Sequence, residues 1–442
     1  MCPARSCTAT AGLPLEKGVG SLDEMLAARR LPLAARCSWA ASFCSLDRSI
    51  KSSLLGYDTL NASEQRQPII LSLASSLQLQ QPHIFTDKLH AYLNSANQSL
   101  HLSMRLREDV LIMMKSNKKK NINDERIHVL DDILKKWLHT FLASDAIQLK
   151  RVTFEESSGE MLEKVAKGDL VYPVKRMRDL KLRVRLNNGK RCFVIHHANF
   201  PNDPLAFLHF ALSQKLEGSI PSLYATEEDL KEPTHAIFYS VSSPHASLTG
   251  LDMAAKIIKF AVKHIQSHHP SVTTFSTLSP IPGFAAWLDR VVKQKSYENI
   301  KWSSTVTQEF VRQHSEIIGN SPQKNEIVEF VHRAMKGIAS VDDIRRMQGV
   351  LTSLIGHYLV NEKIKDSGTL VPLDPVARFH LRNGAELHRV NFLGNASKEA
   401  IGASAGFMVN YLYDLSKLDE RNETFIKTGK FSVHDQVLSG IV

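Results

Sequence analysis

The sequence has few cysteines, and they are unevenly placed. Of five cysteines, Cys2, Cys7, Cys37 and Cys44 lie near the N-terminus, and Cys192 stands alone in the body of the chain. No two of them have the C-x-x-C spacing of a zinc site, and the distribution does not form a disulfide framework. The pattern excludes a small disulfide-stapled fold and is typical of a reducing interior compartment.

Long apolar runs and common ligand motifs are also missing. No apolar run reaches the roughly 18 to 20 residues that a membrane-spanning helix needs. The sequence contains neither the G-x-x-x-x-G-K-[ST] nor the G-x-G-x-x-G nucleotide motif, and it lacks the H-E-x-x-H metal motif, although His264, His268 and His269 cluster. We therefore expect no metal, no cofactor and no membrane partner.

The composition is that of an ordinary globular protein with a basic balance. Of 442 residues, 43% are hydrophobic and 23% are charged, and the net charge is +10. Such a charge attracts anions, which include nucleic acid, an anionic membrane face or a polyanionic small molecule. The densest basic cluster, Lys115 with Lys118, Lys119 and Lys120, lacks the aromatic residues that stack on bases. We expect a solvated loop there and no nucleic-acid partner.

The first part of the chain falls into two segments. Residues 1–66 are rich in Ala, Ser, Leu and Arg, which is typical of an organelle transit peptide or of a disordered tail. Residues 67–171 are predicted to form a helical domain, since the pattern from about 84 to 170 is helical. From Asp124 onward, apolar residues recur at spacings of three and four, as on one face of an amphipathic helix.

After residue 172 the pattern changes to short apolar runs bounded by Pro, Gly, Asn and Asp. The fold class that follows is α+β: an all-helical N-terminal domain, then a mixed α/β domain over 172–442. The expected elements are strands at 191–197, 205–211, 235–242 and 272–278, a helix at 251–267, further helices within 305–363 and a last helix at 397–416.

The first candidate site is the connection between the strand at 235–242 and the helix that follows it. A loop of small residues before a helix N-terminus suits an anion, because free backbone N–H groups and the helix dipole point at the ligand. An ordinary strand-to-helix connection explains the same pattern. The loop residues are Ala246, Ser247, Leu248, Thr249, Gly250, Leu251 and Asp252.

Two further regions carry groups suited to chemistry. Ser276 and Ser279 lie at the end of a strand, and Pro280 and Pro282 make the next turn rigid, so a hydroxyl can be held against a substrate. Alternatively, these residues only mark the end of the strand, where Ser and Pro are common. His380 lies next to the Asn383-Gly384 turn and is suited to proton transfer, although any single one of the 19 histidines is more often structural or merely exposed.

A hydrolase-like pattern is also present. Residues 402–406 satisfy G-x-S-x-G around Ser404, and Asp414, Asp419 and His434 follow in the order of a catalytic triad. A nucleophile elbow needs a strand directly before it, whereas the preceding residues predict a helix. Small residues on a packed helix explain the pattern better than a serine hydrolase does.

Taken together, these segments resemble the malonyl-CoA decarboxylase family. The likeness runs from about residue 124 to 435. It is carried by VYPVK at 171–175, AIFYS at 236–240, TLSPIPGF at 277–284, PVARFHLRNGA at 375–385 and MVNYLY at 408–413.

The resemblance implies a helical N-terminal domain and a GNAT-like catalytic domain that binds coenzyme A at the loop 246–252. It implies cofactor-free conversion of malonyl-CoA to acetyl-CoA and CO2 in fatty acid metabolism. By motif position, Ser276, His380 and Tyr413 are the expected catalytic residues, and Ser276 and His380 also contact the substrate. Where relatives commonly have several glycines and a Glu in the loop, only Gly250 and Asp252 stand here.

The resemblance also implies a homo-oligomer and the mitochondrial matrix, with the cytoplasm or peroxisome as alternatives. The chain ends in SGIV rather than in an SKL-type address. Two other functions stay open at this point: a GNAT-like acyl-CoA-dependent acyltransferase, and a serine hydrolase that uses Ser404.

Overall fold

The computed structural model describes residues 50–439 apart from short gaps at 52–53, 55–56, 58–59, 61–62, 79–81, 96–98, 144–145, 170, 187–188, 226–229, 301, 303, 338–339 and 367. The chain divides into two compact units, residues 1–141 and 142–442. Most of the expected N-terminal tail lies outside the described residues.

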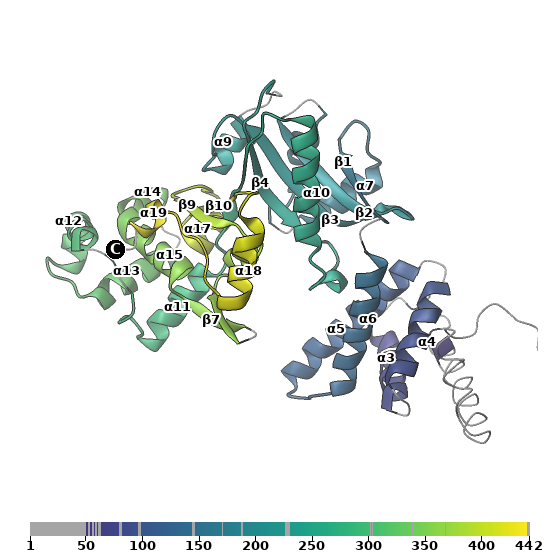
Figure 1. The fold of residues 1–442 in the computed structure, drawn as a ribbon. Coiled ribbons are helices and arrows are strands. Elements are labelled where there is room, and N and C mark those ends of the chain that lie inside the picture. Colours follow the sequence, from purple (N-terminus) through teal and green to yellow (C-terminus); the bar gives the residue numbers. More distant parts are fainter. Residues whose placement is uncertain are drawn as a thin grey trace, which may run out of the picture. The chain divides into compact units, whose positions relative to one another are not determined.

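The first unit is helical (Figure 1). Its four long helices are α3 (Ser63–Gln78), α4 (Pro82–Ser95), α5 (Ser99–Lys119) and α6 (Glu125–Phe141). The apolar stripe predicted from Asp124 onward is buried along α6, and the Trp137 indole N–H donates to the Asn94 side-chain oxygen at 3.0 Å. The lysines at 118–120 are exposed, as expected, but Lys118 and Lys119 form the last turn of α5 rather than a loop.

The expected tail boundary at residue 66 is too far along the chain. Ile50, Leu54 and Tyr57 are buried, and the Tyr57 hydroxyl donates to the carboxylate of Asp109 in α5 at 2.5 Å. Arg66 also pairs with Asp109 at 2.6 Å. These residues therefore belong to the helical unit, because burial and ion pairing hold them on it.

The second unit is built on an eight-stranded sheet (Figure 1). The strand order is β1-β2-β3-β4-β5-β10-β6, and β9 pairs with β10. Among the strands of the described residues, β4 and β5 alone pair in parallel, and α10 (Met253–His268) connects them. The strands are β1 (Ile147–Val152), β2 (Lys190–His197), β3 (Phe200–Ser213), β4 (His235–Ser242), β5 (Thr274–Thr277), β6 (Ser279–Pro280), β9 (Glu386–Asn391) and β10 (Met408–Tyr413).

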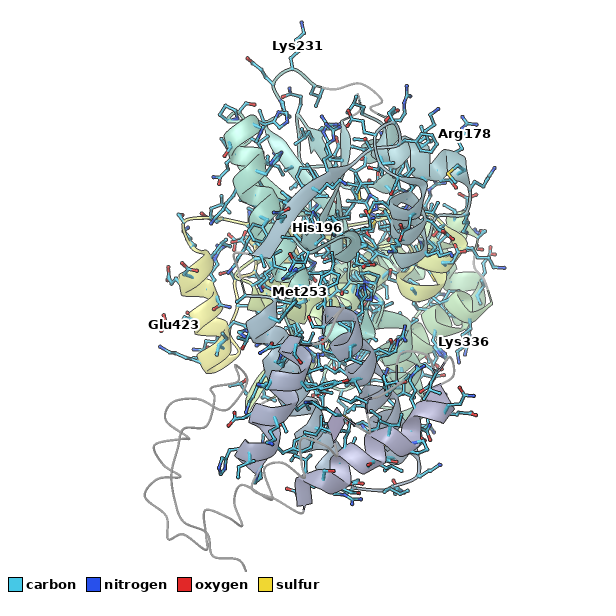
Figure 2. The ribbon with its side chains drawn as sticks, turned by 90° about the vertical axis from the view of Figure 1, so that its right-hand side faces the viewer. Arg178, His196, Lys231, Met253, Lys336 and Glu423 are labelled. Carbon is cyan, nitrogen blue, oxygen red and sulfur yellow. The ribbon has the colours of Figure 1, made fainter. Side chains whose placement is uncertain are left out.

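Several helices pack against this sheet, and a two-stranded sheet of β7 (Lys363–Asp366) and β8 (Thr369–Pro372) is separate from it. Figure 2 labels Met253 at the start of α10. The helices are α7 (Gly159–Gly168), α8 (Met177–Val184), α9 (Ile220–Ala225), α10 (Met253–His268), α11 (Phe284–Gln294), α12 (Ser304–Ile318), α13 (Lys324–Lys336), α14 (Val341–Arg346), α15 (Gln348–Val360), α16 (Pro375–Arg382), α17 (Lys398–Ser404), α18 (Leu418–Thr428) and α19 (Asp435–Leu438), with a short 3-10 turn η3 (Ala246–Leu248).

The α+β class is confirmed, whereas the domain boundary expected at 171 is wrong. β1 pairs with β2 from Ile147 to Val152, so the segment that looked helical up to 170 already contains a strand of the second unit. Its two end residues are buried and exposed or half-buried side chains lie between them, and the helical pattern begins only with α7 at Gly159.

The last expected helix, 397–416, is also wrong. α17 ends at Ser404 because Ala405 and Gly406 both have positive φ, and residues 408–413 then form β10. β10 is almost wholly buried in the sheet, so tertiary pairing outweighs the local helical pattern.

Candidate functional site

His380 lies on the short helix α16, whose first residues favour helix initiation. Asp374 precedes α16 and Pro375 is its first residue, a combination that favours helix initiation. His380 lies in the last turn of that helix and is buried, with 6% of its surface exposed. The ring is therefore directed into the protein.

Both nitrogens of His380 have side-chain partners. Nε2 lies 3.0 Å from the Ser279 hydroxyl oxygen, and Nδ1 lies 2.8 Å from the Tyr413 hydroxyl oxygen. Ser279 also donates to the Thr277 hydroxyl oxygen at 3.0 Å, and that oxygen accepts the backbone N–H of Tyr411 at 3.1 Å. A continuous hydrogen-bond chain thus connects β10, α16 and the β5–β6 strand ends.

Burial determines the protonation states of His380 and Tyr413 in this hydrogen-bond chain. It lowers the pKa of His380 from its usual 6.5 to about 3, and it raises the pKa of Tyr413 above its usual range. His380 is therefore a neutral imidazole at neutral pH, and one of its nitrogens accepts while the other donates.

This hydrogen-bond chain borders a small pocket of about 270 Å³. Its walls come from the end of β4, the β5–β6 connection, the first turn of α10 and helix α16. Most of its surface is apolar, and Ser279 and His380 supply polar groups. The lining residues are Val171, Phe238, Tyr239, Ser240, Val241, Ala254, Thr277, Ser279, Pro280, Pro375, Val376, Phe379 and His380.

The structure brings His380 and Tyr413 together but does not bring Ser276 to them. The Ser276 hydroxyl donates to the backbone carbonyl of Tyr411 at 3.1 Å, and its side chain is fully buried within the sheet. Ser279, the second hydroxyl of the same stretch, makes the contact with His380. In the sequence, Ser279 stands directly before Pro280, and this position could have selected it. At this point strand β10 changes its pairing partner from β5 to β6.

The predicted coenzyme loop continues from a wall of this pocket. Val241 of β4 and Ala254 of α10 both line the pocket, and residues 246–252 connect their two elements. Gly250 and Asp252 have positive φ, and the Asp252 side chain makes no capping hydrogen bond to α10. The N–H groups at the start of α10 are thus available to an anion.

Ser404 has no nucleophile geometry. It lies at the end of α17, and its hydroxyl donates to the backbone carbonyl of Phe407 at 3.0 Å. A helix rather than a strand precedes it, which excludes the elbow that a hydrolase of this type requires. Asp414 and Ser416 pair with each other instead.

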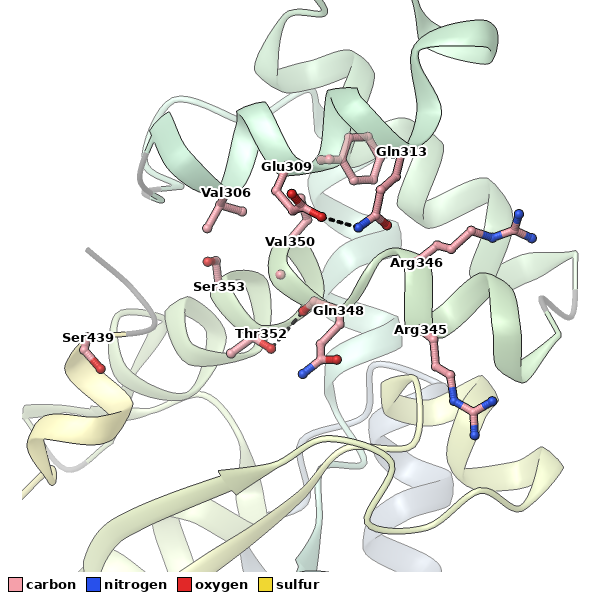
Figure 3. A pocket seen from close by; sticks show the side chains of 12 residues that line it. Val306, Glu309, Gln313, Arg345, Arg346, Gln348, Val350, Thr352, Ser353 and Ser439 are labelled. Carbon is pink, nitrogen blue, oxygen red and sulfur yellow. Dashed lines mark hydrogen bonds between the residues drawn. The ribbon is translucent and has the colours of Figure 1, made fainter.

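The described part of the chain offers no metal-binding cluster and no membrane-spanning helix. Among these residues, no group of three or more His, Cys, Asp or Glu side chains could hold a metal ion, and none of the helices is long and apolar enough to cross a bilayer. A pocket of about 400 Å³ beside α12, α14 and α15 is shown in Figure 3, and it contains none of the predicted site residues.

The fold and the site together define an α+β protein whose mixed unit holds a buried Ser–His–Tyr chain beside a small, mainly apolar pocket. A sequence model described as "Malonyl-CoA decarboxylase C-terminal domain" matches residues 145–441. The chain belongs to the malonyl-CoA decarboxylase family.

Curated relatives carry the same name. A mitochondrial malonyl-CoA decarboxylase of Anser anser anser is 33% identical over 325 residues, which are 72% of this chain and 62% of that protein. The Rattus norvegicus protein of the same name is 29% identical over 363 residues, 79% of this chain and 70% of that protein. The chain thus spans about two thirds of the length of these relatives.

Solved structures share the fold. The crystal structure of malonyl-CoA decarboxylase from Cupriavidus metallidurans superposes with a TM-score of 0.68 at 24% identity, over 91% of this chain and 99% of that one. The Agrobacterium vitis structure gives a TM-score of 0.67 at 23% identity. A relationship of the second unit to GNAT acetyltransferases remains an expectation from the family resemblance.

Proposed function

We propose that this chain decarboxylates malonyl-CoA to acetyl-CoA and CO2 and so controls the level of malonyl-CoA in fatty acid metabolism. One observation carries the proposal: a neutral imidazole, with a hydroxyl on each nitrogen, lies at the wall of a pocket of about 270 Å³. The family's name agrees with this chemistry. A pocket of this size suits the short acyl end of the substrate, with the coenzyme outside it.

The reaction needs no electron sink beyond the substrate. When the bond between C2 and the carboxyl carbon breaks, its electron pair moves into the thioester carbonyl, and an enolate and CO2 result. The protein has to stabilise the enolate oxygen and to deliver one proton to C2. Hydrogen-bond donors aimed at such an oxygen are each worth about 3 kcal/mol.

His380 can supply the proton only if substrate binding charges it. With a pKa of about 3 in the empty pocket, the imidazole carries no transferable extra proton at pH 7. The malonyl carboxylate brings a negative charge into the pocket, and an adjacent opposite charge favours the imidazolium. His380 then takes one proton from solvent, gives it to C2 after CO2 has left, and returns to the neutral form.

We assign to Ser279 the role that the sequence suggested for Ser276. Its hydroxyl lies 3.0 Å from the reacting nitrogen, so it can hydrogen-bond the malonyl group and hold the carboxylate out of conjugation with the thioester. The hydrogen bond between the Tyr413 hydroxyl and Nδ1 fixes the imidazole orientation. Ser276 stays a sheet residue in this assignment.

Coenzyme A would lie along the loop 246–252 at the start of α10. Its diphosphate suits the N–H groups of the first turn of α10, and the net charge of +10 raises the encounter rate with a polyanion. Asp252 is exposed and stands where relatives commonly have Glu. We therefore assign the diphosphate binding to the backbone at the start of α10 rather than to that side chain.

For location we propose the mitochondrial matrix, since the relatives are named mitochondrial and the first 49 residues carry several arginines. Fusing residues 1–66 to a fluorescent protein tests this, and a cytoplasmic or peroxisomal signal contradicts it.

We also propose that the protein is a homo-oligomer. Light scattering of the purified full chain tests this, and a monomeric mass contradicts it.

The function is tested by incubating the purified full chain with malonyl-CoA and nothing else. We expect acetyl-CoA and CO2 in equal amounts. Binding without conversion would overturn the proposal. An acyltransferase would instead release product only when an acceptor amine is added.

A further inference from the structure

Asp374 holds the N-terminus of the helix that carries His380. One of its carboxylate oxygens, Oδ1, accepts the backbone N–H groups of Val376 at 3.0 Å and Ala377 at 2.9 Å. This is an ordinary helix cap, and one oxygen is enough to make it. The residue is nevertheless fully buried, with 0% of its surface exposed.

The second oxygen of Asp374 reaches other elements. Oδ2 accepts the hydroxyl of Tyr358 in α15 at 3.2 Å, and it lies against Gly283, 3.4 Å from the position of a Cβ atom built there. Gly283 ends the rigid Ser279–Gly283 turn. The carboxylate therefore joins the turn that bears Ser279 to the helix that bears His380.

The approach at Gly283 is so close that no side chain fits. A Cβ atom built there would lie 2.1 Å from the Tyr358 hydroxyl oxygen and 3.4 Å from Asp374 Oδ2. Glycine is thus the one residue type that allows this contact. The Tyr358 ring also packs against Phe284 and Trp287 of α11, which begins directly after the turn. The link is a packed junction rather than a surface contact.

We propose that Asp374 is a positioning residue that sets the distance between Ser279 and His380, the two groups that must meet the substrate together. This inference rests on the proposed decarboxylase activity. A helix cap alone would need no second oxygen and no buried tyrosine. A misplacement of about 1 Å at a reacting centre can cost on the order of 100-fold in rate.

The variant Asp374→Ser separates capping from positioning. Serine is a good N-cap and keeps a hydroxyl for Val376 and Ala377, but it lacks the second oxygen for Tyr358 and Gly283. Tyr358→Phe breaks the link from the other side and leaves the cap untouched. Ser158→Ala, which removes the N-cap of α7 away from the site, is the matched control for a lost cap.

We expect kcat to fall about 10- to 100-fold in Asp374→Ser and several-fold in Tyr358→Phe, while KM changes less than about twofold. Ser158→Ala should lower the melting temperature without changing kcat. A folded Asp374→Ser with wild-type kcat would overturn the proposal, as would a loss of kcat that simply follows the melting temperature across all three variants. If Asp374→Ser does not fold, Tyr358→Phe alone decides by the same criteria.

A second measurement needs no activity. The 15N chemical shifts of the His380 ring report which nitrogen carries the proton, and hence whether the contact with Ser279 is kept. We expect these shifts to change in Asp374→Ser and Tyr358→Phe and to stay at wild-type values in Ser158→Ala. A wild-type chain without decarboxylase activity refutes the proposed function, whereas unchanged ring shifts refute the positioning role.

Discussion

The imidazole of His380 stacks on the ring of Tyr411, with centroids 4.6 Å apart and an interplanar angle of 24°. Phe379 covers His380 edge-on at 5.0 Å. These aromatic contacts keep water from the ring faces, so the two nitrogens are left to Ser279 and Tyr413. The same contacts cause the burial that lowers the His380 pKa.

Replacing His380 by Asn should abolish most turnover. We expect kcat to fall about 100- to 10,000-fold, the range of a lost general acid, while KM changes little because the pocket is retained. Steady-state kinetics with malonyl-CoA measures both. His139→Asn, at an exposed position of α6, is the control and should behave as wild type. Full activity in His380→Asn would remove the residue from the mechanism.

The two serines of the strand end should respond differently to alanine. Ser279→Ala removes the hydroxyl next to His380 and should lower kcat about 100- to 1,000-fold. Ser276→Ala loses a buried hydrogen bond to Tyr411, so it should cost about 1 kcal/mol of unfolding free energy but keep most of its turnover. The reverse pattern would return the catalytic assignment to Ser276.

Substrate binding should take up a proton. An entering carboxylate raises the His380 pKa by roughly 1 to 3 units from about 3. Binding of S-carboxymethyl-CoA, a thioether without the reactive carbonyl, should therefore take up a fraction of a proton that grows as the pH is lowered from 7 toward 5. Calorimetry in buffers of different ionisation enthalpy measures this number. His380→Asn should bind the same ligand with no uptake, and equal uptake in both proteins would contradict the role of His380.

Stability should depend on His380 at acidic pH. The folded pKa, about 3, lies below the unfolded value near 6.5, so between these pH values only the unfolded chain binds the proton. The contribution is complete above pH 6.5 and is lost as the pH falls, by up to about 1.4 kcal/mol per pH unit. Urea unfolding of His380→Asn should therefore show a shallower slope between pH 6 and 4; parallel curves would contradict this.

The turn after α16 should not tolerate a side chain. Gly384 has φ +82°, and a Cβ there would lie 2.3 Å from the backbone oxygen of Leu418. Gly384→Ala should lower the melting temperature by several degrees, since strain alone costs about 1 to 2 kcal/mol. Gly402→Ala in α17 meets no atom within 4 Å and should be neutral or slightly stabilising. Equal effects of the two changes would refute the close approach.

Local patterns in the sequence predicted several elements well. The alternation and bounding residues gave β2, β4 and α10 to within about two residues. The helix 397–416 was wrong because Ala405 and Gly406 take positive φ and the residues after them join the sheet. Strand β1 was missed because six residues pair with a partner some forty positions away.

The sequence alone determined what depends on neighbouring residues: the capped start of α16, the apolar stripe of α6, the rigid turn after Ser279 and the family to which the chain belongs. Only the tertiary structure decided which hydroxyl meets His380. That choice depends on the pairing of β10 with both β5 and β6, which directs Ser276 to a backbone carbonyl and Ser279 to the imidazole. Residues a hundred positions apart are brought within 3.0 Å by the whole sheet, and no local pattern encodes that distance.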